Sequence, residues 1–276
     1  MKKEDLRKYI KIKLLIEINN FELIHAKKGR KYLYSNEICL DIFLDVLIEG
    51  VTYRYACKHI KNKNAYTSIY KRIKKWIENN IFINIYDNAV SEYLKKNELC
   101  NLYVDSTDVI NLNGNKEYTN YSFKHRSKRC IRITIISTDN KIPIYYDISK
   151  ASKKDSNILE NIIETNDIKF KKNTYICGDK GYQTNKKIRN KYKKRKITLC
   201  VPKKSYKKEK PKNKRKRQIE RQSKGMKIVL KKRTLIENLF SRLHRTFKRI
   251  NKMYDKRKDK YKSYLCVALT ALIIGL

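Results

Sequence analysis

The feature that most limits how this chain folds is a change in apolar periodicity after Leu99. From there on, runs of β-branched and aromatic residues alternate with polar, turn-forming segments, which is typical of strands. The predicted strands are Leu102–Ile110, Ile131–Thr138 and Pro143–Ser149. Three consecutive strands therefore begin this part of the chain.

Helices and strands alternate in the segment that follows. The expected elements are a helix over Ser156–Thr165, a strand at Thr174–Cys177, a helix capped by Thr184 and ending at Tyr192, a strand at Ile197–Val201, and a long closing helix over Leu230–Asn251. The order βββαβαβ with a closing helix predicts an α/β fold, a ribonuclease H-like mixed sheet flanked by helices.

The earlier part of the chain has helical patterns instead. We expect a helix over Asn36–Glu49 that ends at Gly50, a second helix after Thr52 and a third after Thr67. In the third helix the apolar residues share one face, while Lys71, Lys74 and Lys75 fall elsewhere on the cylinder. The sequence predicts a helix-turn-helix-like, all-α domain over residues 1–98 and a second domain over 99–276. A small helical bundle with a merely solvated basic face is the alternative to a DNA-binding role.

The charge of the chain predicts a polyanionic partner. Sixty-eight Lys and Arg residues stand against 27 Asp and Glu residues, which gives a formal net charge of +41. Nucleic acid, an anionic membrane surface and an acidic protein all fit this charge. The charge alone therefore fixes only the sign of the partner.

Two observations predict an intracellular protein without a membrane segment. The N-terminus lacks the apolar core of a signal peptide, and the apolar run Leu265–Leu276 is shorter than the roughly 20 residues that span a bilayer. We expect that run to form a buried helix. The seven cysteines are scattered without a Cys-x-x-Cys pair, which favours buried thiols in a reducing compartment over disulfides or a zinc site.

Basic clusters in the second domain predict contacts with phosphate. Residues 124–129 contribute Lys124, Arg126, Lys128 and Arg129, whereas His125 is disfavoured as a metal ligand. Residues 203–224 form a basic segment with almost no apolar residues, which we interpret as a mobile loop. That loop either clamps DNA or is simply solvated.

Asp105 is the first candidate for a catalytic carboxylate. It lies in the middle of the first predicted strand, where a charge is costly unless a metal ion or another group compensates it. Because side chains alternate along a strand, Asp105 and Thr107 share one face and Asp108 points to the other. Asp105 is therefore the better metal-ligand candidate.

Asp179 and Glu237 are the other two candidates. Asp179 comes directly after a short strand, and the flanking Gly178 and Gly181 allow a sharp turn and the close approach of another backbone or a ligand. The alternative is an Asp that only stabilises the turn. Glu237 lies at the edge of the apolar stripe of the closing helix, where Arg233, His244 and Lys248 project near it. On the helix alone, an ion pair between Arg233 and Glu237 is the favoured interpretation.

These residues resemble the DDE transposases of bacterial insertion sequences, particularly the insertion-sequence-five group. Val104–Thr107 is similar to that family's first-Asp strand, and Gly178–Tyr182 to its second-Asp turn. Arg233-x-x-x-Glu237-x-x-Phe240-x-x-Leu243-His244, followed by Phe247–Ile250 and Tyr254-Asp255, is similar to its glutamate helix in order and spacing. The chain departs from a related group at Leu230 and His244, which replace a Tyr and a Lys.

The resemblance implies an enzyme that cleaves DNA and transfers strands. Asp105, Asp179 and Glu237 would hold two Mg²⁺ or Mn²⁺ ions per site, with Asp105 bridging them. Arg233 and His244 would position phosphate or the glutamate. Double-stranded DNA at the element ends and target would be the partner, bound by a homodimer or higher multimer. The alternatives are a catalytically inactive DNA-binding descendant and a basic RNA-binding protein, and the latter does not explain an acidic residue in an apolar strand.

Overall fold

The computed structural model describes residues 3–24, 32–60, 65–113, 116–122, 125, 128–165, 174–202 and 229–275, apart from the side chains of Lys3, Ile24, Thr165 and Lys186. Contacts divide the chain into two compact units. Unit 1 consists of Met1–Tyr93, Val109–Tyr118 and Ser241–Leu276, and unit 2 consists of Leu94–Asp108 and Thr119–Phe240. Each unit is described by itself below.

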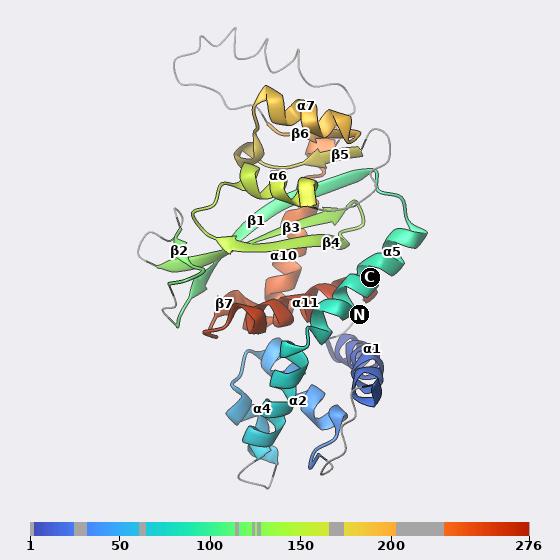
Figure 1. Ribbon diagram of the computed structural model, residues 1–276, viewed down its shortest axis with the longest axis vertical. Coiled ribbons are helices and arrows are strands. Elements are labelled where there is room, and N and C mark those ends of the chain that lie inside the picture. The colour runs from blue at the N-terminus through green and yellow to red at the C-terminus, as the bar shows by residue number, and fades with distance from the viewer. Residues whose placement is uncertain are drawn as a thin grey trace. The chain divides into compact units, whose positions relative to one another are not determined.

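The strands form one mixed sheet (Figure 1). The strands that the structure describes are β1 (Asn101–Asn111), β2 (Asn120–Tyr121), β3 (Arg129–Thr138), β4 (Pro143–Lys150), β5 (Thr174–Cys177), β6 (Ile197–Cys200) and β7 (Lys252–Met253). The order is β2-β3-β1-β5-β6, with β4 paired to β3 and β7 to β1. β3 and β4 are antiparallel, whereas β5 runs parallel to both β1 and β6. The predicted α/β class with a mixed sheet is confirmed.

Helices cover the sheet within unit 2. α6 (Asp155–Thr165) and α7 (Lys186–Lys194) lie in front of the strands in the view of Figure 1. They are joined by ion pairs from Lys191 to Glu160 and Glu164, at 3.5 and 2.8 Å. The apolar stripe of α6, made of Ile158, Leu159, Ile162 and Ile163, is buried. The helical spacing of α6 in the sequence therefore marks its core-facing side.

The ends of several elements in unit 2 differ slightly from the predictions. β2 was not predicted, because two residues are too short to carry a pattern. The cap of α7 is Asn185 and not Thr184, because the Asn185 side chain accepts the Ile188 N–H at 2.9 Å. The Thr184 hydroxyl is buried without a hydrogen-bond partner among the described residues.

Unit 1 is mostly helical. Its elements include α1 (Lys3–Ile24), α2 (Asn36–Glu49), α3 (Tyr53–Ala56), η1 (Cys57–His59), α4 (Ala65–Glu78), most of α5 (Ile81–Lys96), η3 (Lys248–Asn251) and α11 (Lys258–Ile274). The predicted bounds of α2 and the start of α3 directly after Thr52 are confirmed, but α4 begins at Ala65, three residues earlier than predicted. α1 and α5 were not predicted.

The predicted helix over Leu230–Asn251 is not continuous. Residues 229–231 are helical, 232–233 form a turn, and α10 spans Thr234–Thr246. Phe247 leaves the helical conformation at φ −116° and ψ 87°. The Asn251 side chain ends α10 by donating to the carbonyl of His244 at 3.0 Å. A polar side chain that folds back onto the last turn thus stops a helix whose apolar pattern continues.

The C-terminal helix α11 is buried, as predicted. Every residue from Ser263 to Leu272 is buried, and α11 packs against α1, α4 and η3. The ring of Tyr264 stacks on Phe43, which stacks on Phe82, with centroids 5.2 and 4.5 Å apart. Among the described residues, no helix is long and apolar enough to cross a membrane.

The cysteines are free thiols. Cys100 is exposed, and the other six are buried. Burial raises the pKa of Cys39 and Cys177 to about 11 and that of Cys200 to about 12. These thiols therefore behave as small apolar core residues, as predicted.

Candidate active site

Asp105 lies in β1 within unit 2 and is only partly exposed. Its Oδ1 atom accepts the backbone N–H of Ser106 at 2.8 Å. The pKa of Asp105 is raised to about 6, mainly by burial and also by the negative charges of Asp179 and Glu237, while the Ser106 hydrogen bond and the positive charge of Arg233 lower it. The carboxylates of three separate segments therefore influence one another electrostatically.

Asp179 lies directly after β5, in a turn that two glycines make possible. Its Oδ1 atom accepts the Gly181 N–H at 2.7 Å, which starts the 3₁₀ helix η2 (Lys180–Tyr182). A Cβ atom at Gly178 would lie 2.7 Å from the Tyr182 ring, and one at Gly181 would lie 2.8 Å from Asp155 Oδ2. Neighbouring side chains, and not another backbone, therefore approach both glycines closely.

Glu237 lies in the first turn of α10 and pairs with Arg233, with 2.7 Å between Oε1 and Nη2. The ion pair that the helical spacing favoured is therefore present. The side chains of Glu237 and Arg233 are 46% and 32% exposed, so the pair contributes little to stability. Its exposure leaves the Glu237 carboxylate accessible to a ligand.

The three carboxylates have the chemistry of a divalent-metal site, because hard cations prefer oxygen ligands. Burial is the main cause of the raised Asp105 pKa, and a cation would relieve the repulsion from Asp179 and Glu237 that adds to it. Among the described residues, however, no group of three His, Cys, Asp or Glu side chains lies close enough to hold a metal ion. Asp105, Asp179 and Glu237 have suitable oxygen atoms for a metal ion, and the positive charge near Asp105 comes from Arg233.

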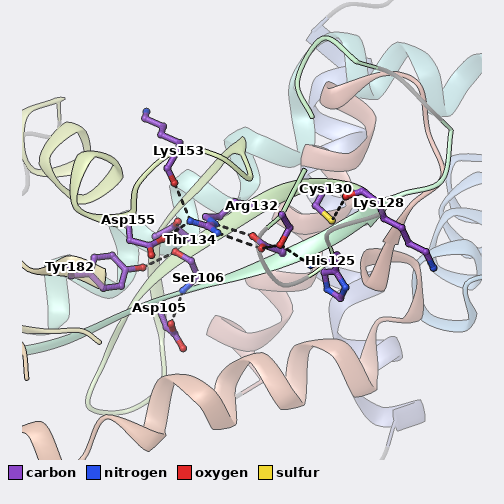
Figure 2. Close-up of polar contacts among 12 residues, drawn as sticks. Asp105, Ser106, His125, Lys128, Cys130, Arg132, Thr134, Lys153, Asp155 and Tyr182 are labelled. Atoms are coloured by element: carbon purple, nitrogen blue, oxygen red, sulfur yellow. Dashed lines mark hydrogen bonds and ion pairs between the residues drawn. The ribbon is translucent and has the colours of Figure 1, made fainter. Parts of the chain in front are cut away.

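A network of polar contacts surrounds Arg132 in the same part of unit 2 as Asp105 (Figure 2). Arg132 Nε is 2.9 Å from Asp108 Oδ1, and its Nη1 is 3.0 Å from Asp155 Oδ1. Asp108 also accepts the hydroxyl of Ser122. Asp108 therefore has a structural partner, while Asp105 points away from this network in Figure 2. The prediction that Asp105 and Asp108 occupy opposite faces of the strand agrees with these contacts.

Asp155 was not predicted as part of the site. Burial, followed by the charge of Asp179 among other causes, raises its pKa, although Arg132 opposes the shift. It begins α6, and an Asp at a helix start is so common that it carries no functional signal. Only the folded chain brings it next to Gly181 and Asp179.

A chain of hydroxyls crosses from β3 to the Asp179 turn. Ser106 Oγ lies 2.7 Å from Thr134 Oγ1 and 2.6 Å from the Tyr182 hydroxyl. Ser106 and Thr134 belong to the neighbouring strands β1 and β3, while Tyr182 ends η2. Figure 2 shows Tyr182 directed at Ser106.

An open groove of about 770 Å³ lies next to Gly181 in unit 2. Basic, hydroxyl and amide side chains line most of it. They include Arg132, Lys153, Lys154, Ser122, Ser152, Ser156, Tyr121 and Gln183, together with Asp155. The groove is therefore polar with an excess of positive charge, as a path for a phosphodiester backbone requires.

The residues predicted to contact DNA are distributed over both units. In unit 1, Lys71 and Lys74 are exposed on α4, where Lys74 Nζ lies 3.6 Å from Glu78 Oε1, and Lys75 Nζ lies 3.5 Å from Glu22 Oε2. In unit 2, Lys128 is exposed, and Arg129 donates to the Thr119 carbonyl at 3.2 Å. Lys124, Arg126 and the loop 203–224 lie outside the described residues.

Two further predicted contacts, His244 and Lys248, lie in unit 1. His244 Nδ1 is 2.6 Å from Asn251 Oδ1, and Lys248 Nζ is 3.2 Å from Glu49 Oε2. Because α10 ends at Thr246, Lys248 does not project from the same helix as Glu237. The prediction that Arg233, His244 and Lys248 project near Glu237 assumed one continuous helix. The helix is interrupted at residues 232–233 and ends at Thr246.

The mixed sheet of this α/β fold carries Asp105 on β1 and Asp179 directly after β5, and α10 carries Glu237. Residues 97–273, more than half of the chain, match the family described as transposase DDE domain. The chain belongs to this family. Comparisons with curated proteins and with solved structures find no match.

Proposed function

We propose that this chain is a transposase that cuts DNA and transfers the cut strands at a site made by Asp105, Asp179 and Glu237. The observation that carries the proposal is that three acidic side chains from separate segments act on one position: burial raises the pKa of Asp105 to about 6, and the charges of Asp179 and Glu237 contribute to that shift. Membership of the DDE family supports the same residues. The spacing and residues of the Arg233–Asp255 segment favour the insertion-sequence-five group within it.

Two Mg²⁺ or Mn²⁺ ions are the proposed cofactors, and Asp105, Asp179 and Glu237 would hold them. Bound ions of this kind activate water or a 3′-hydroxyl and stabilise the leaving oxygen at a phosphodiester. The donor set fits, since carboxylate oxygens match hard cations. The Arg233 guanidinium, 2.7 Å from Glu237, is placed to contact a phosphate of the bound DNA strand.

Double-stranded DNA is the proposed partner, and the groove beside Gly181 is the proposed path of one strand. Arg132 lies in the groove lining, held between Asp108 and Asp155, while Lys153 and Lys154 add two further cations. These side chains can follow a backbone without reading its sequence. Binding as a homodimer or higher multimer is part of the proposal through the family resemblance.

The fold and domain assignments are proposed in the same way. The order of the strands in the sheet supports a ribonuclease H-like fold for residues 99–276. In that order β4 pairs with β3, and β1, β5 and β6 follow β3 on its other side. The succession of α3, η1 and α4 supports a helix-turn-helix-like, DNA-binding unit within residues 1–98. In that unit Lys71 and Lys74 are the exposed basic side chains of α4 that we assign to phosphate contacts.

The test compares plasmid nicking and DNA binding by Asp105→Asn, Asp179→Asn and Glu237→Gln. The matched control is Glu160→Gln, which likewise removes a helical glutamate from an exposed ion pair. We expect Mg²⁺-dependent nicking by the wild type and the control, a loss of at least about a thousandfold in each acidic variant, and unchanged DNA affinity. Full nicking by any acidic variant would remove that residue from the site.

A second candidate function is a DNA-binding protein that has lost catalysis. The pairing of Glu237 with Arg233 favours it, because a carboxylate engaged by a cation is less available to a metal. The presence of all three acidic residues opposes it. This candidate predicts tight DNA binding by the wild type with no nicking in either Mg²⁺ or Mn²⁺.

A further inference from the structure

The Tyr182 side chain connects the segments that carry Asp105 and Asp179. Its hydroxyl lies 2.6 Å from Ser106 Oγ, and Ser106 directly follows Asp105. The backbone N–H of Ser106 in turn donates to Asp105 Oδ1. At the other end, the Tyr182 N–H donates to the Asp179 carbonyl at 3.3 Å. One side chain thus bridges the backbones next to both carboxylates.

The ring of Tyr182 has a tightly defined position. Tyr182 is 1% exposed, and a Cβ atom at position 178 would lie 2.7 Å from its Cδ2 atom. The same Cβ atom would lie 3.0 Å from Val104 Cγ1. The Asp179 turn is therefore packed against the residue before Asp105, while its tyrosine is bonded to the residue after it.

The hydroxyl of Tyr182 is part of a connected network. Ser106 Oγ also contacts Thr134 Oγ1 at 2.7 Å, so three hydroxyls join β3, β1 and η2. A buried network whose members are all bonded fixes one arrangement of its elements.

We propose that Tyr182 is a positioning residue that fixes the spacing between the Asp105 and Asp179 carboxylates through its bond to Ser106. This inference rests on the proposed function, because the spacing matters only if the two carboxylates share metal ions. Mutation of a residue that holds a metal ligand in place commonly weakens metal binding by about 10- to 100-fold. Tyr182 acts on the ligands through the backbone and does not itself contact DNA or metal.

The experiment compares Tyr182→Phe with Tyr192→Phe in the full chain. Tyr192 also lies in unit 2 and is 1% exposed, but its hydroxyl has no hydrogen-bond partner among the described residues. Each substitution removes one hydroxyl oxygen from an equally buried tyrosine, but only Tyr182→Phe removes a hydrogen bond to Ser106. Mn²⁺ binding is measured by calorimetry without DNA, alongside the thermal unfolding midpoint without metal.

We expect Tyr182→Phe to weaken Mn²⁺ binding by about tenfold and to raise the Mg²⁺ concentration for half-maximal nicking by a similar factor. The KM for DNA should change by less than about twofold, since the groove is untouched. Tyr192→Phe should bind Mn²⁺ like the wild type. If Tyr182→Phe lowers the unfolding midpoint while Mn²⁺ binding is unchanged, its role is structural and the inference is overturned.

Ser106→Ala provides an independent variant. If Tyr182 acts through Ser106, this variant weakens Mn²⁺ binding as Tyr182→Phe does, and the double variant loses no more than either single one. Additive losses in the double variant would contradict the inference. Asp105→Asn separates the two proposals: if it binds Mn²⁺ as well as the wild type, the proposed function fails. If it loses Mn²⁺ and Tyr182→Phe does not, only the positioning role fails.

Discussion

Burial and two neighbouring carboxylates together hold the pKa of Asp105 at about 6, above its ordinary value. Between about pH 4 and pH 6 the folded chain therefore keeps a proton that the unfolded chain has released. A group whose pKa is raised in this way makes the free energy of unfolding fall as the pH rises through that window. The carboxylate is retained at a cost to stability, which is common for residues with a catalytic role.

Asp105→Asn should remove this pH dependence in the metal-free protein. Asn resembles the protonated side chain, so the variant and the wild type should be equally stable at about pH 4. At pH 7 the variant should be more stable by about 2 to 3 kcal/mol, the value of a shift of roughly two pKa units. Urea unfolding at several pH values without divalent metal measures this, and parallel curves for the two proteins would contradict it.

Arg132 is the residue whose removal should most disturb the site without touching the three carboxylates. It pairs with Asp108, whose side chain is 7% exposed, and with Asp155. Arg132→Met leaves both acids without their cation and should cost about 3 kcal/mol, as expected for breaking a buried pair.

Lys191→Met is the control for that loss. Lys191 also pairs with two acids, Glu160 and Glu164, but its side chain is 51% exposed. Lys191→Met should leave the free energy of unfolding close to that of the wild type. Equal losses from Arg132→Met and Lys191→Met in urea unfolding would show that the Arg132 network does not stabilise unit 2.

At the scale of elements, local patterns predicted the strands better than they predicted where helices stop. β1, β3 and β4 were each placed to within two residues at both ends, because β-branched runs bounded by polar segments are local signals. α10 ends where Asn251 folds back onto His244, seven positions away in sequence. No apolar pattern contains that hydrogen bond, so the sequence overestimated the helix.

The same distinction holds within the candidate site. Asp105 and Asp179 were found because a charge in an apolar strand and an acid between two glycines are local anomalies. Asp155 and Tyr182 look ordinary in the sequence, one at a helix start and the other after a turn. Their contacts join residues 23 and 76 positions apart, and only tertiary structure creates those contacts.

The end of α2 provides a prediction for a single element. Gly50 has a φ of 73°, a conformation that favours glycine, and an added Cβ atom would lie 3.1 Å from Lys248 Cβ. Gly50→Ala should therefore lower the free energy of unfolding of unit 1 by about 1 to 2 kcal/mol. Gly275→Ala, at a helix end with a φ of −99°, should change it by less than about 0.5 kcal/mol in the same assay. Equal effects would exclude backbone strain at Gly50.

At the scale of the whole molecule, compact units are not contiguous in the sequence. Ser241–Leu276 belongs to the same unit as the N-terminal helices, and Tyr264 of α11 donates to the Tyr53 hydroxyl at 2.9 Å. A division at residue 98 follows the change in periodicity, but burial of α11 depends on partners more than 200 positions away. Periodicity cannot reveal such pairing.

The net charge of +41 gives a prediction for the intact chain. Each phosphate that a Lys or Arg neutralises releases counterions, so the DNA affinity should fall steeply with salt. With six or more such contacts, the affinity should drop by at least about a thousandfold between roughly 50 and 200 mM salt. Fluorescence anisotropy with a labelled duplex measures this slope. A flat response would exclude the proposed phosphate contacts.

The central claim is that Asp105, Asp179 and Glu237 form one metal site, and Fe²⁺-directed cleavage of the polypeptide tests it most directly. Fe²⁺ in place of Mg²⁺, with added hydrogen peroxide as oxidant and ascorbate as reductant, generates hydroxyl radicals that cut the backbone near the Fe²⁺ ligands. The account predicts cuts near residues 105, 179 and 237 in the full chain, suppressed by excess Mg²⁺ and abolished by Asp105→Asn. Cuts at other positions, or cuts that persist in Asp105→Asn, would contradict it.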